Sequence, residues 1–423
     1  MIRFYNGKVL TLCGFATEIT DSEVWVDGDS IIYVGEKRVD SPLFEREIDL
    51  KGNLLMPSFK NAHSHSAMTF LRSFADDLPL KEWLFDRVFP LEDKLTPDKV
   101  YHLTKSAVLE YLSSGITAAM DMYFFPDACA QANIDCGFRT VICSGVGGSA
   151  EGVKRLEREW KHFTKLNPLV SYSMGFHAEY TCEYELLKGI GELAQEYKAP
   201  VFTHNSETEN EVAECRARYG MTPTQLFESL HIYDNGGGGF HCVYLDDEDV
   251  EIFQRRKLHI VSCPASNAKL ASGIAPLCRY AEKGISLGLG TDGAASNNAL
   301  DMFREMYLAT VLQKLSCADA SAMPAETVLK MATSGSAHAM GLTDCDCIDA
   351  GKKADLIVVD LNQPNMQPVN NIVKNLVYSA CKQNVVMTMV NGRILYENGE
   401  FFVGDSVDNI YNNANRIVKE ICN

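Results

Sequence analysis

The 423-residue sequence lacks the features that would direct it to a membrane or to nucleic acid. It has no run of about 18 apolar residues, so a membrane span is not expected. Basic residues are in deficit, because 39 lysines and arginines face 56 acidic residues and give a net charge of −17. This balance argues against nucleic acid and anionic membranes as partners, since both attract a basic face.

The sequence also lacks a CxxC pair: its 14 cysteines are scattered, and the closest two are Cys345 and Cys347. We expect reduced thiols of a cytoplasmic protein rather than a disulfide framework. The first residues, MIRFYNGKVLTLCG, turn polar too early for a signal peptide. The sequence therefore predicts a soluble cytoplasmic protein. It leaves open whether the chain forms a homo-oligomer.

Both ends of the chain carry a β-type pattern. Short alternating apolar runs are separated by NG, DG and KG turns in residues 1–55, and by NGR and NGE turns in residues 347–423. We expect the two ends to meet in one small sheet domain, with residues 56–346 forming a second domain between them.

The middle of the chain alternates apolar runs with helical patterns in which apolar residues recur at i, i+3, i+4 and i+7. Eight strand–helix units of this kind predict an α/β fold, a (β/α)8 barrel. Residues 66–115 form a long insertion after the first strand and are expected to build a wall over the active site. The glycines of 234–240 are expected to form a flexible turn. The expected strands lie within 52–65, 116–123, 138–145, 169–180, 199–207, 238–245, 257–267 and 284–293.

Side chains that can bind a metal fall at the ends of these strands. His63 and His65 are two residues apart, so in a strand they point to the same side. Alone, such a pair is more often hydrogen-bonded or exposed than bound to metal. The carboxyl ends of barrel strands are, however, where active sites lie. The further strand-end residues are His177, His204, His241 and Asp292. The histidines expected to have surface or structural roles are His102, His162, His231, His259 and His338.

These residues resemble the pattern of the amidohydrolase superfamily. The segments HSHSAMTFLRSFADDLPLKEWL, HNSETENE, HCVYL, PASNAKLASGIAP and GTDGAASNNALDMFREM are similar to its S-adenosylhomocysteine/5′-methylthioadenosine deaminase branch. The resemblance covers nearly the whole chain. It implies a metal-dependent barrel and a small β-sandwich built from the two ends.

The resemblance implies a ligand set of His63, His65, His204 and Asp292 for one divalent metal. Three imidazoles and a carboxylate suit Zn²⁺ with a position left for water, whose pKa would fall towards about 7; iron and nickel are alternatives. Related enzymes with two metals use a strand-four lysine, and residues 167–181 contain none. This points to a mononuclear site.

The resemblance also implies catalytic roles. Glu207 would protonate the substrate ring and carry a proton to the departing ammonia. His241 would polarise the attacking hydroxide, and Asp292 would accept its proton. A competing interpretation makes Glu207 a surface carboxylate at a helix start.

Substrate contacts are implied for Glu92 with the ribose, His177 with the adenine, Arg155 with an amino-acid tail and Trp83 as a wall. Each has a plainer alternative: a solvated charge for Glu92 and Arg155, a core position for His177 and Trp83. Ser144 stands where relatives that bind S-adenosylhomocysteine can carry an arginine, and Cys263 stands where some relatives have histidine.

The expected activity is hydrolytic deamination of an adenine nucleoside (S-adenosylhomocysteine, 5′-methylthioadenosine or adenosine) to its inosine analogue and ammonia. Competing hypotheses are an aminohydrolase or chlorohydrolase acting on a guanine-like, pterin or triazine ring, an amide or ester hydrolase with two metals, and a barrel that serves only as a scaffold.

Overall fold

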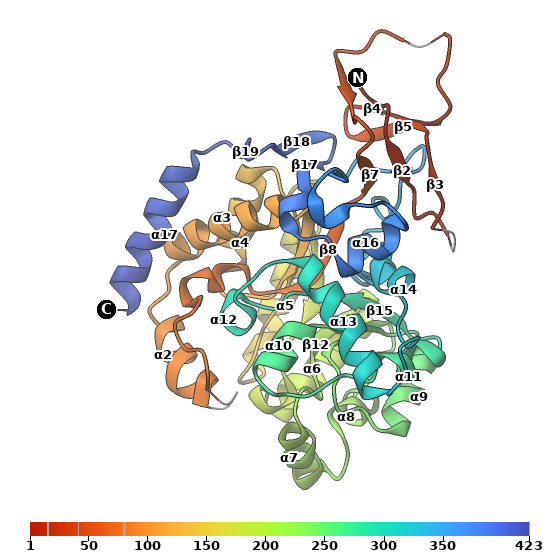
Figure 1. Cartoon of the computed structure of the whole chain (residues 1–423). Helices are drawn as coiled ribbons and strands as arrows, with labels where there is room; N and C mark the ends of the chain where they lie inside the picture. Colours follow the sequence, from red (N-terminus) through yellow and green to blue (C-terminus); the bar gives the residue numbers. More distant parts are fainter. Residues whose placement is uncertain (15–16, 41, 79–81, 423) are drawn as a thin grey trace.

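The computed structural model describes residues 1–14, 17–40, 42–78 and 82–422. Its centre is a barrel-like sheet of eight parallel strands arranged in chain order from β8 to β15 (Figure 1). Nearly every strand position is buried, as expected for parallel strands that are covered on both faces. The strands are β8 (Phe59–Ser64), β9 (Ile116–Asp121), β10 (Arg139–Cys143), β11 (Val170–Gly175), β12 (Val201–Asn205), β13 (Gly237–His241), β14 (His259–Ser262) and β15 (Ser286–Leu289).

The first and last strands meet at their carboxyl ends. The Asp292 amide donates to the carbonyl of His63 at 3.0 Å, and the Thr291 amide donates to the Asn61 side chain at 2.8 Å. The predicted (β/α)8 barrel is confirmed by this sheet. The closure also brings residues 63 and 292 together, although they are far apart in the sequence.

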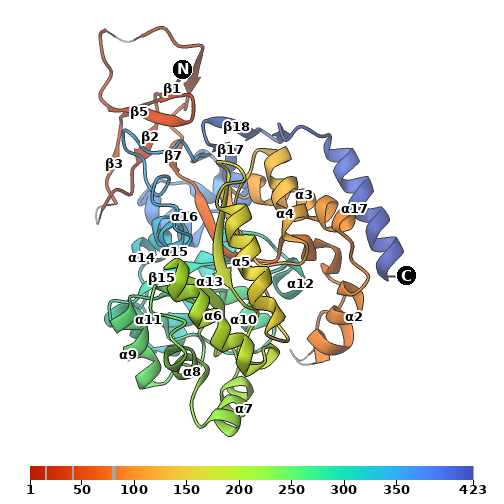
Figure 2. The same ribbon diagram turned by 180° about the vertical axis from the view of Figure 1, so that it is seen from behind.

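Helices follow the strands and cover the sheet, and α5 and α6 are best seen from behind (Figure 2). Several begin at a side chain that accepts an amide hydrogen bond from three residues on, as Thr96, Thr208, Thr222 and Asp246 do. The helices are α3 (Pro97–Ser113), α4 (Pro126–Cys136), α5 (Glu151–Phe163), α6 (Tyr184–Tyr197), α7 (Glu209–Tyr219), α8 (Pro223–Ser229), α9 (Asp247–Arg256), α10 (Pro264–Lys269), α11 (Leu277–Glu282), α12 (Ala294–Asn297), α13 (Met302–Ser316), α14 (Ala325–Lys330) and α15 (Ser336–Ala339).

The insertion after β8 is helical. A 3-10 helix η1 (Ser66–Leu71), a π-helix η2 (Trp83–Val88) and a short α2 (Phe89–Glu92) precede α3. Residues 79–81 of the insertion lie outside the described residues.

The two β-rich ends of the chain form two sheets; one joins strands of both ends, as expected, and the other contains N-terminal strands alone. A four-stranded sheet has the order β5 (Ser30–Gly35), β4 (Glu23–Asp27), β1 (Ile2–Tyr5), β6 (Arg46–Asp49). A seven-stranded sheet mixes both ends, in the order β19 (Glu400–Phe401), β18 (Arg393–Glu397), β17 (Val385–Val390), β16 (Leu356–Val359), β7 (Leu54–Pro57), β2 (Lys8–Leu10), β3 (Ile19–Thr20).

Strand β16 shows how the seven-stranded sheet joins the barrel. Leu356 and Val358 belong to the apolar core shared with the four-stranded sheet, whereas Ile357 and Val359 belong to the main core. Alternate residues of a strand point to opposite faces, so its run of four apolar residues is buried on both sides.

The single apolar run expected at 52–65 is in fact two strands. Residues 54–57 form β7 in the seven-stranded sheet and residues 59–64 form barrel strand β8, with only Ser58 between them. The domain limits at 55/56 and 346/347 stay predictions. The remaining helices of this part are α16 (Ile372–Tyr378) and α17 (Val407–Cys422). Helix α17 lies beside α3 in both views, with Ile410, Ile417 and Ile421 in the main core (Figures 1 and 2).

Of the glycines of 234–240, only Gly236 lies in a turn before the strand, as expected from the sequence: its amide donates to the carbonyl of Tyr233 at 3.1 Å. Gly237, Gly238 and Gly239 belong to strand β13. A Cβ atom on Gly237 would lie 1.9 Å from the carbonyl oxygen of Val201, and one on Gly238 would lie 2.1 Å from that of His259. Neighbouring strands approach too closely here for any side chain. Among the described residues, no helix is long and apolar enough to cross a membrane.

Candidate metal centre and active-site cavity

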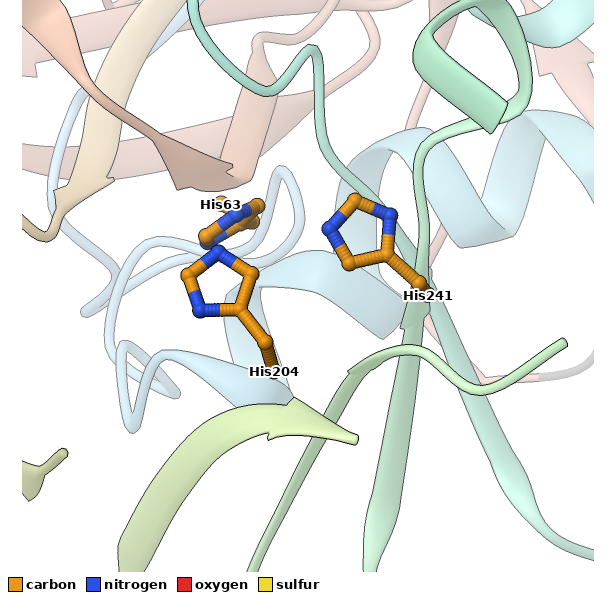
Figure 3. Close-up of side chains that lie close together, drawn as sticks. All are labelled: His63, His204 and His241. Atoms are coloured by element: carbon orange, nitrogen blue, oxygen red, sulfur yellow. The ribbon is translucent and has the colours of Figure 1, made fainter. Parts of the chain in front are cut away.

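Five predicted site residues meet at the carboxyl ends of the barrel strands. His63, His204 and His241 end or nearly end β8, β12 and β13, and their imidazoles converge (Figure 3). Ring nitrogens of these three lie within 4.8 Å of one another. His65 and Asp292 complete the cluster: Asp292 Oδ1 is 3.2 Å from His65 Nε2 and 3.6 Å from His63 Nε2.

The outer nitrogens of three histidines are anchored to the protein. His204 Nδ1 is 2.6 Å from the carbonyl oxygen of His177, and His241 Nδ1 is 2.7 Å from the Asn267 side-chain oxygen. His65 Nδ1 makes the same kind of bond to the Met122 carbonyl. Such bonds fix the orientation of the ring and turn Nε2 towards the centre.

His63 differs from these three. It is fully buried and stacks on the Phe240 ring at 3.8 Å, yet neither ring nitrogen has a hydrogen-bond partner among the described residues. Burial lowers the pKa of His63 and of His204 well below the ordinary value, so both are neutral and able to act as ligands. A buried nitrogen without a partner is costly, and a cation would satisfy it.

Asp292 is held in one orientation. Its backbone is left-handed, with φ of 58°, and its Oδ2 accepts hydrogen bonds from Ser266 Oγ at 2.6 Å and Ser296 Oγ at 2.8 Å. Burial alone would raise the pKa of Asp292, but His65 and the other imidazoles hold it well below the ordinary value. The carboxylate is therefore ionised. Imidazole nitrogens and a carboxylate oxygen form a donor set that fits a divalent metal of the zinc type.

Glu207 lies two residues after β12 and is buried next to this cluster. Its Oε1 accepts a hydrogen bond from Ser272 Oγ at 3.1 Å, and its Oε2 is 3.9 Å from His241 Nε2. The alternative of a solvated carboxylate at a helix start does not hold, because only 7% of the residue is exposed.

A cavity opens over the cluster. Its lining includes His65, His204, Glu207, His241 and Asp292, together with the four other residues expected to contact substrate: Trp83, Glu92, His177 and Arg155. Trp83 and Glu92 come from η2 and α2, so the insertion forms a wall of the cavity, as its position predicted.

Three of the four have partners already. Glu92 accepts a hydrogen bond from the Tyr123 hydroxyl at 2.7 Å, and burial raises the pKa of Glu92 to about 7. His177 Nδ1 is 3.2 Å from Thr181 Oγ1, and burial with nearby positive charge lowers the pKa of His177 to about 4.

Arg155 Nε donates to Glu159 Oε1 at 2.6 Å, so a carboxylate of the protein already pairs with this guanidinium. Ser144 is buried at the end of β10, and Gly145 beside it lines the cavity.

Sequence reasoning did not single out the residues that hold the catalytic candidates. The turn at the start of α10 supplies Ser266 to Asp292 and Asn267 to His241. Glu211 accepts from the amides of Ser206 and Glu207. The sequence carried a signal for Glu211, because Thr208 and Glu211 are spaced as in a capping box.

A barrel with clustered histidines and an aspartate at its strand ends is typical of the class of metal-dependent barrel hydrolases. The sequence matches the model of the amidohydrolase family over residues 54–395, and the chain belongs to that family. The family and the enzyme class expected from the sequence are thus confirmed.

Relatives of known name extend along almost the whole chain. A 5-methylthioadenosine/S-adenosylhomocysteine deaminase from Pelotomaculum thermopropionicum is 39% identical over 403 residues, which are 94% of this chain and 93% of that protein. Its namesake from Moorella thermoacetica is 41% identical over 361 residues, 84% of each chain. The crystal structure of an adenosine deaminase from Xanthomonas campestris with bound zinc has a TM-score of 0.94 and 31% identity, covering 100% of this chain and 98% of that one.

Proposed function

We propose that this protein is a hydrolytic deaminase of adenine nucleosides that releases ammonia and leaves the inosine analogue. The observation that carries the proposal is the Glu207 carboxylate, buried in the cavity with Oε2 3.9 Å from His241 Nε2 and beside the metal-ligand cluster. The names of the similar proteins support the choice of an adenine nucleoside.

One divalent metal per chain is proposed, held by His63, His65, His204 and Asp292. Zn²⁺ fits this donor set best, and the similar adenosine deaminase contains zinc; Fe²⁺ and Ni²⁺ are alternatives. When bound, such an ion makes water a better nucleophile at neutral pH.

The side chains of the protein would move the protons. Glu207 would protonate the ring nitrogen next to the carbon that carries the amine, which makes that carbon easier to attack. Asp292 would accept a proton from the attacking water, while His241, fixed through Nδ1 by Asn267, would present Nε2 to the same oxygen. Glu207, now ionised, would then take the proton of the added hydroxyl group and pass it to the amine, and the proton on Asp292 would return Glu207 to its acid form. The carbon–nitrogen bond breaks, ammonia leaves and a carbonyl remains.

Substrate recognition is proposed for the residues that line the cavity. Glu92 would accept hydrogen bonds from ribose hydroxyls, His177 would contact the adenine and Trp83 would cover it. Arg155 would face the 5′ substituent. Because Arg155 is paired with Glu159 and Ser144 stands where relatives can carry an arginine, we propose that 5′-methylthioadenosine or adenosine is preferred to S-adenosylhomocysteine.

The test pairs metal analysis of the purified protein with an ultraviolet assay of adenosine, 5′-methylthioadenosine, S-adenosylhomocysteine and adenine. We expect about one metal per chain and conversion of the nucleosides to the hypoxanthine chromophore. One metal without adenine conversion would move the search to the other aminated or halogenated heterocycles. Two metals per chain would contradict the proposal. The cytoplasmic location and the homo-oligomer considered from the sequence stay predictions.

A further inference from the structure

Glu211 is a buried carboxylate that the proposed reaction does not use. It lies near the start of α7 and only 4% of it is exposed. One oxygen accepts the amide of Ser206 at 2.9 Å, and the other accepts the amide of Glu207 at 2.8 Å. Burial, and then the charge of Glu207, raise the pKa of Glu211 to about 7. Placing a second carboxylate beside Glu207 is unfavourable, so its presence needs a reason.

Helix capping alone does not supply that reason. Thr208 already caps α7, because its hydroxyl accepts the amide of Glu211. In an ordinary capping box the glutamate reaches back to the amide of the cap residue itself. Glu211 lies near the cap amide of Thr208 too, but its two hydrogen bonds go to the amides of the two residues before the cap, so they act chiefly on the turn that carries Glu207.

That turn has an unusual backbone. Ser206 has a φ of 51°, in the left-handed region that residues other than glycine seldom adopt. The Ser206 carbonyl accepts the amides of Val243 and Tyr244 at 3.0 and 2.9 Å, in the segment that follows His241. The turn thus connects the strand end that carries Glu207 to the strand end that carries His241.

We propose that Glu211 is a positioning residue for proton transfer. By holding the amides of Ser206 and Glu207 it fixes the left-handed turn, and the turn places the Glu207 carboxylate where it reaches both the ring nitrogen and the departing amine. This inference rests on the proposed role of Glu207.

The test is a double-mutant cycle on kcat, with metal content measured for every variant. Glu211→Gln is isosteric but offers an NH₂ group where one amide needs an acceptor. We expect it to lower kcat by about 10- to 100-fold, as small misplacements of catalytic groups do, and to retain the metal. In the Glu207→Gln background the same change should have almost no effect, because Glu211 acts only through Glu207.

The control is Glu214→Gln, one turn further along α7. Glu214 is half exposed and pairs with Arg218, so its removal changes the local charge equally but leaves the turn intact. Its kcat should match that of the unmodified protein. If Glu211→Gln does not fold, Glu211→Asp replaces it, since it keeps the charge but is too short to reach both amides.

A second readout separates positioning from loss of active molecules. A 6-chloropurine nucleoside releases chloride, which departs without a proton. Glu211→Gln should therefore affect it less than the amine, whereas fewer active molecules would lower both by the same factor. Equal losses with both substrates, equal losses in both backgrounds, or unchanged kcat in Glu211→Gln would overturn the inference. Normal turnover of Glu207→Gln would instead refute the proposed function.

Discussion

Two buried polar clusters share strand β8, one near each end of the barrel. At the amino end, Lys60 donates to Ser58 and Thr117 at 2.7 Å and to Asp355 at 3.2 Å. Arg139 adds bonds of 2.9 and 3.0 Å to the two oxygens of Asp355. At the carboxyl end, three residues after Lys60, His63 has two ring nitrogens without a hydrogen-bond partner among the described residues.

The difference separates stability from function. The Lys60 cluster satisfies its charges within the protein and joins the barrel to the segment before β16. The His63 cluster is incomplete without a cation and opens into the cavity that Glu207 lines. Burial of charged groups therefore does not by itself indicate an active site. Buried polar atoms that lack a hydrogen-bond partner and lie next to a cavity are the better indication.

The largest effect should come from His63→Ala. The variant loses one of the proposed metal ligands, so we expect metal content well below one per chain and loss of nearly all turnover. The matched change is Lys60→Met on the same strand, which should retain the metal while lowering stability, because Ser58, Thr117 and Asp355 lose the bonds that Lys60 donates. Elemental analysis gives the metal content of both variants, and steady-state assays give their kcat. A metal-free Lys60→Met variant, or a His63→Ala variant that keeps its metal and its activity, would contradict the difference between the two clusters.

Glu207→Gln should keep the metal and lose about 10²- to 10⁴-fold in kcat, the usual contribution of a general acid and base. The measurement is steady-state turnover of 5′-methylthioadenosine or adenosine together with metal content. Near-normal turnover would refute the role assigned to Glu207.

Asp355→Asn should cost about 3–5 kcal/mol of unfolding free energy, because Lys60 and Arg139 remain buried without a counter-ion. Burial would raise the pKa of Asp355, but Lys60 and Arg139 outweigh it and hold the pKa well below the ordinary value. Its stabilising effect is therefore present above about pH 4 and is lost only in strong acid. In urea titrations the difference in unfolding free energy between Asp355→Asn and the unmodified protein should stay constant from pH 5 to pH 8. A difference that closes in this range would contradict the assignment.

The smallest effect concerns Glu92, whose pKa of about 7 lies above its value in the unfolded chain. The folded state then binds more protons than the unfolded state, so stability should fall as pH rises from about 4.5 to 7. The expected loss is about 3 kcal/mol, and Glu92→Gln should remove this part of the slope. Urea unfolding of both proteins at several pH values measures it. Identical slopes would show that Glu92 is solvated.

The sequence predicted much of the fold, for identifiable reasons. Barrel strands buried on both faces are continuous apolar runs, and these stand out between amphipathic helices. The predictions failed where local pattern and tertiary contact disagree. The run at 52–65 contains two strands that Ser58 separates, and a sequence pattern does not show which sheet a strand joins. The glycines of β13 look like a turn, but close strand packing requires them.

The site divides in the same way. His63, His65, His204, His241 and Asp292 were found because strand ends converge in a barrel. The residues that orient them were not: Asn267 for His241 and Ser266 for Asp292 come from one turn whose partners are known only once the chain is folded. The pairing of Arg155 with Glu159 is one helical turn long, yet the sequence does not say whether the pair faces the cavity or solvent.

By itself, the sequence determined the order of strands and helices, the chemistry of the ligands and the family to which the chain belongs, because periodicity and residue type are local properties. Only the tertiary structure decided which donors are satisfied and which are not. That depends on distances between residues far apart in the chain, such as His63 and Asp292, and these are set when the barrel closes.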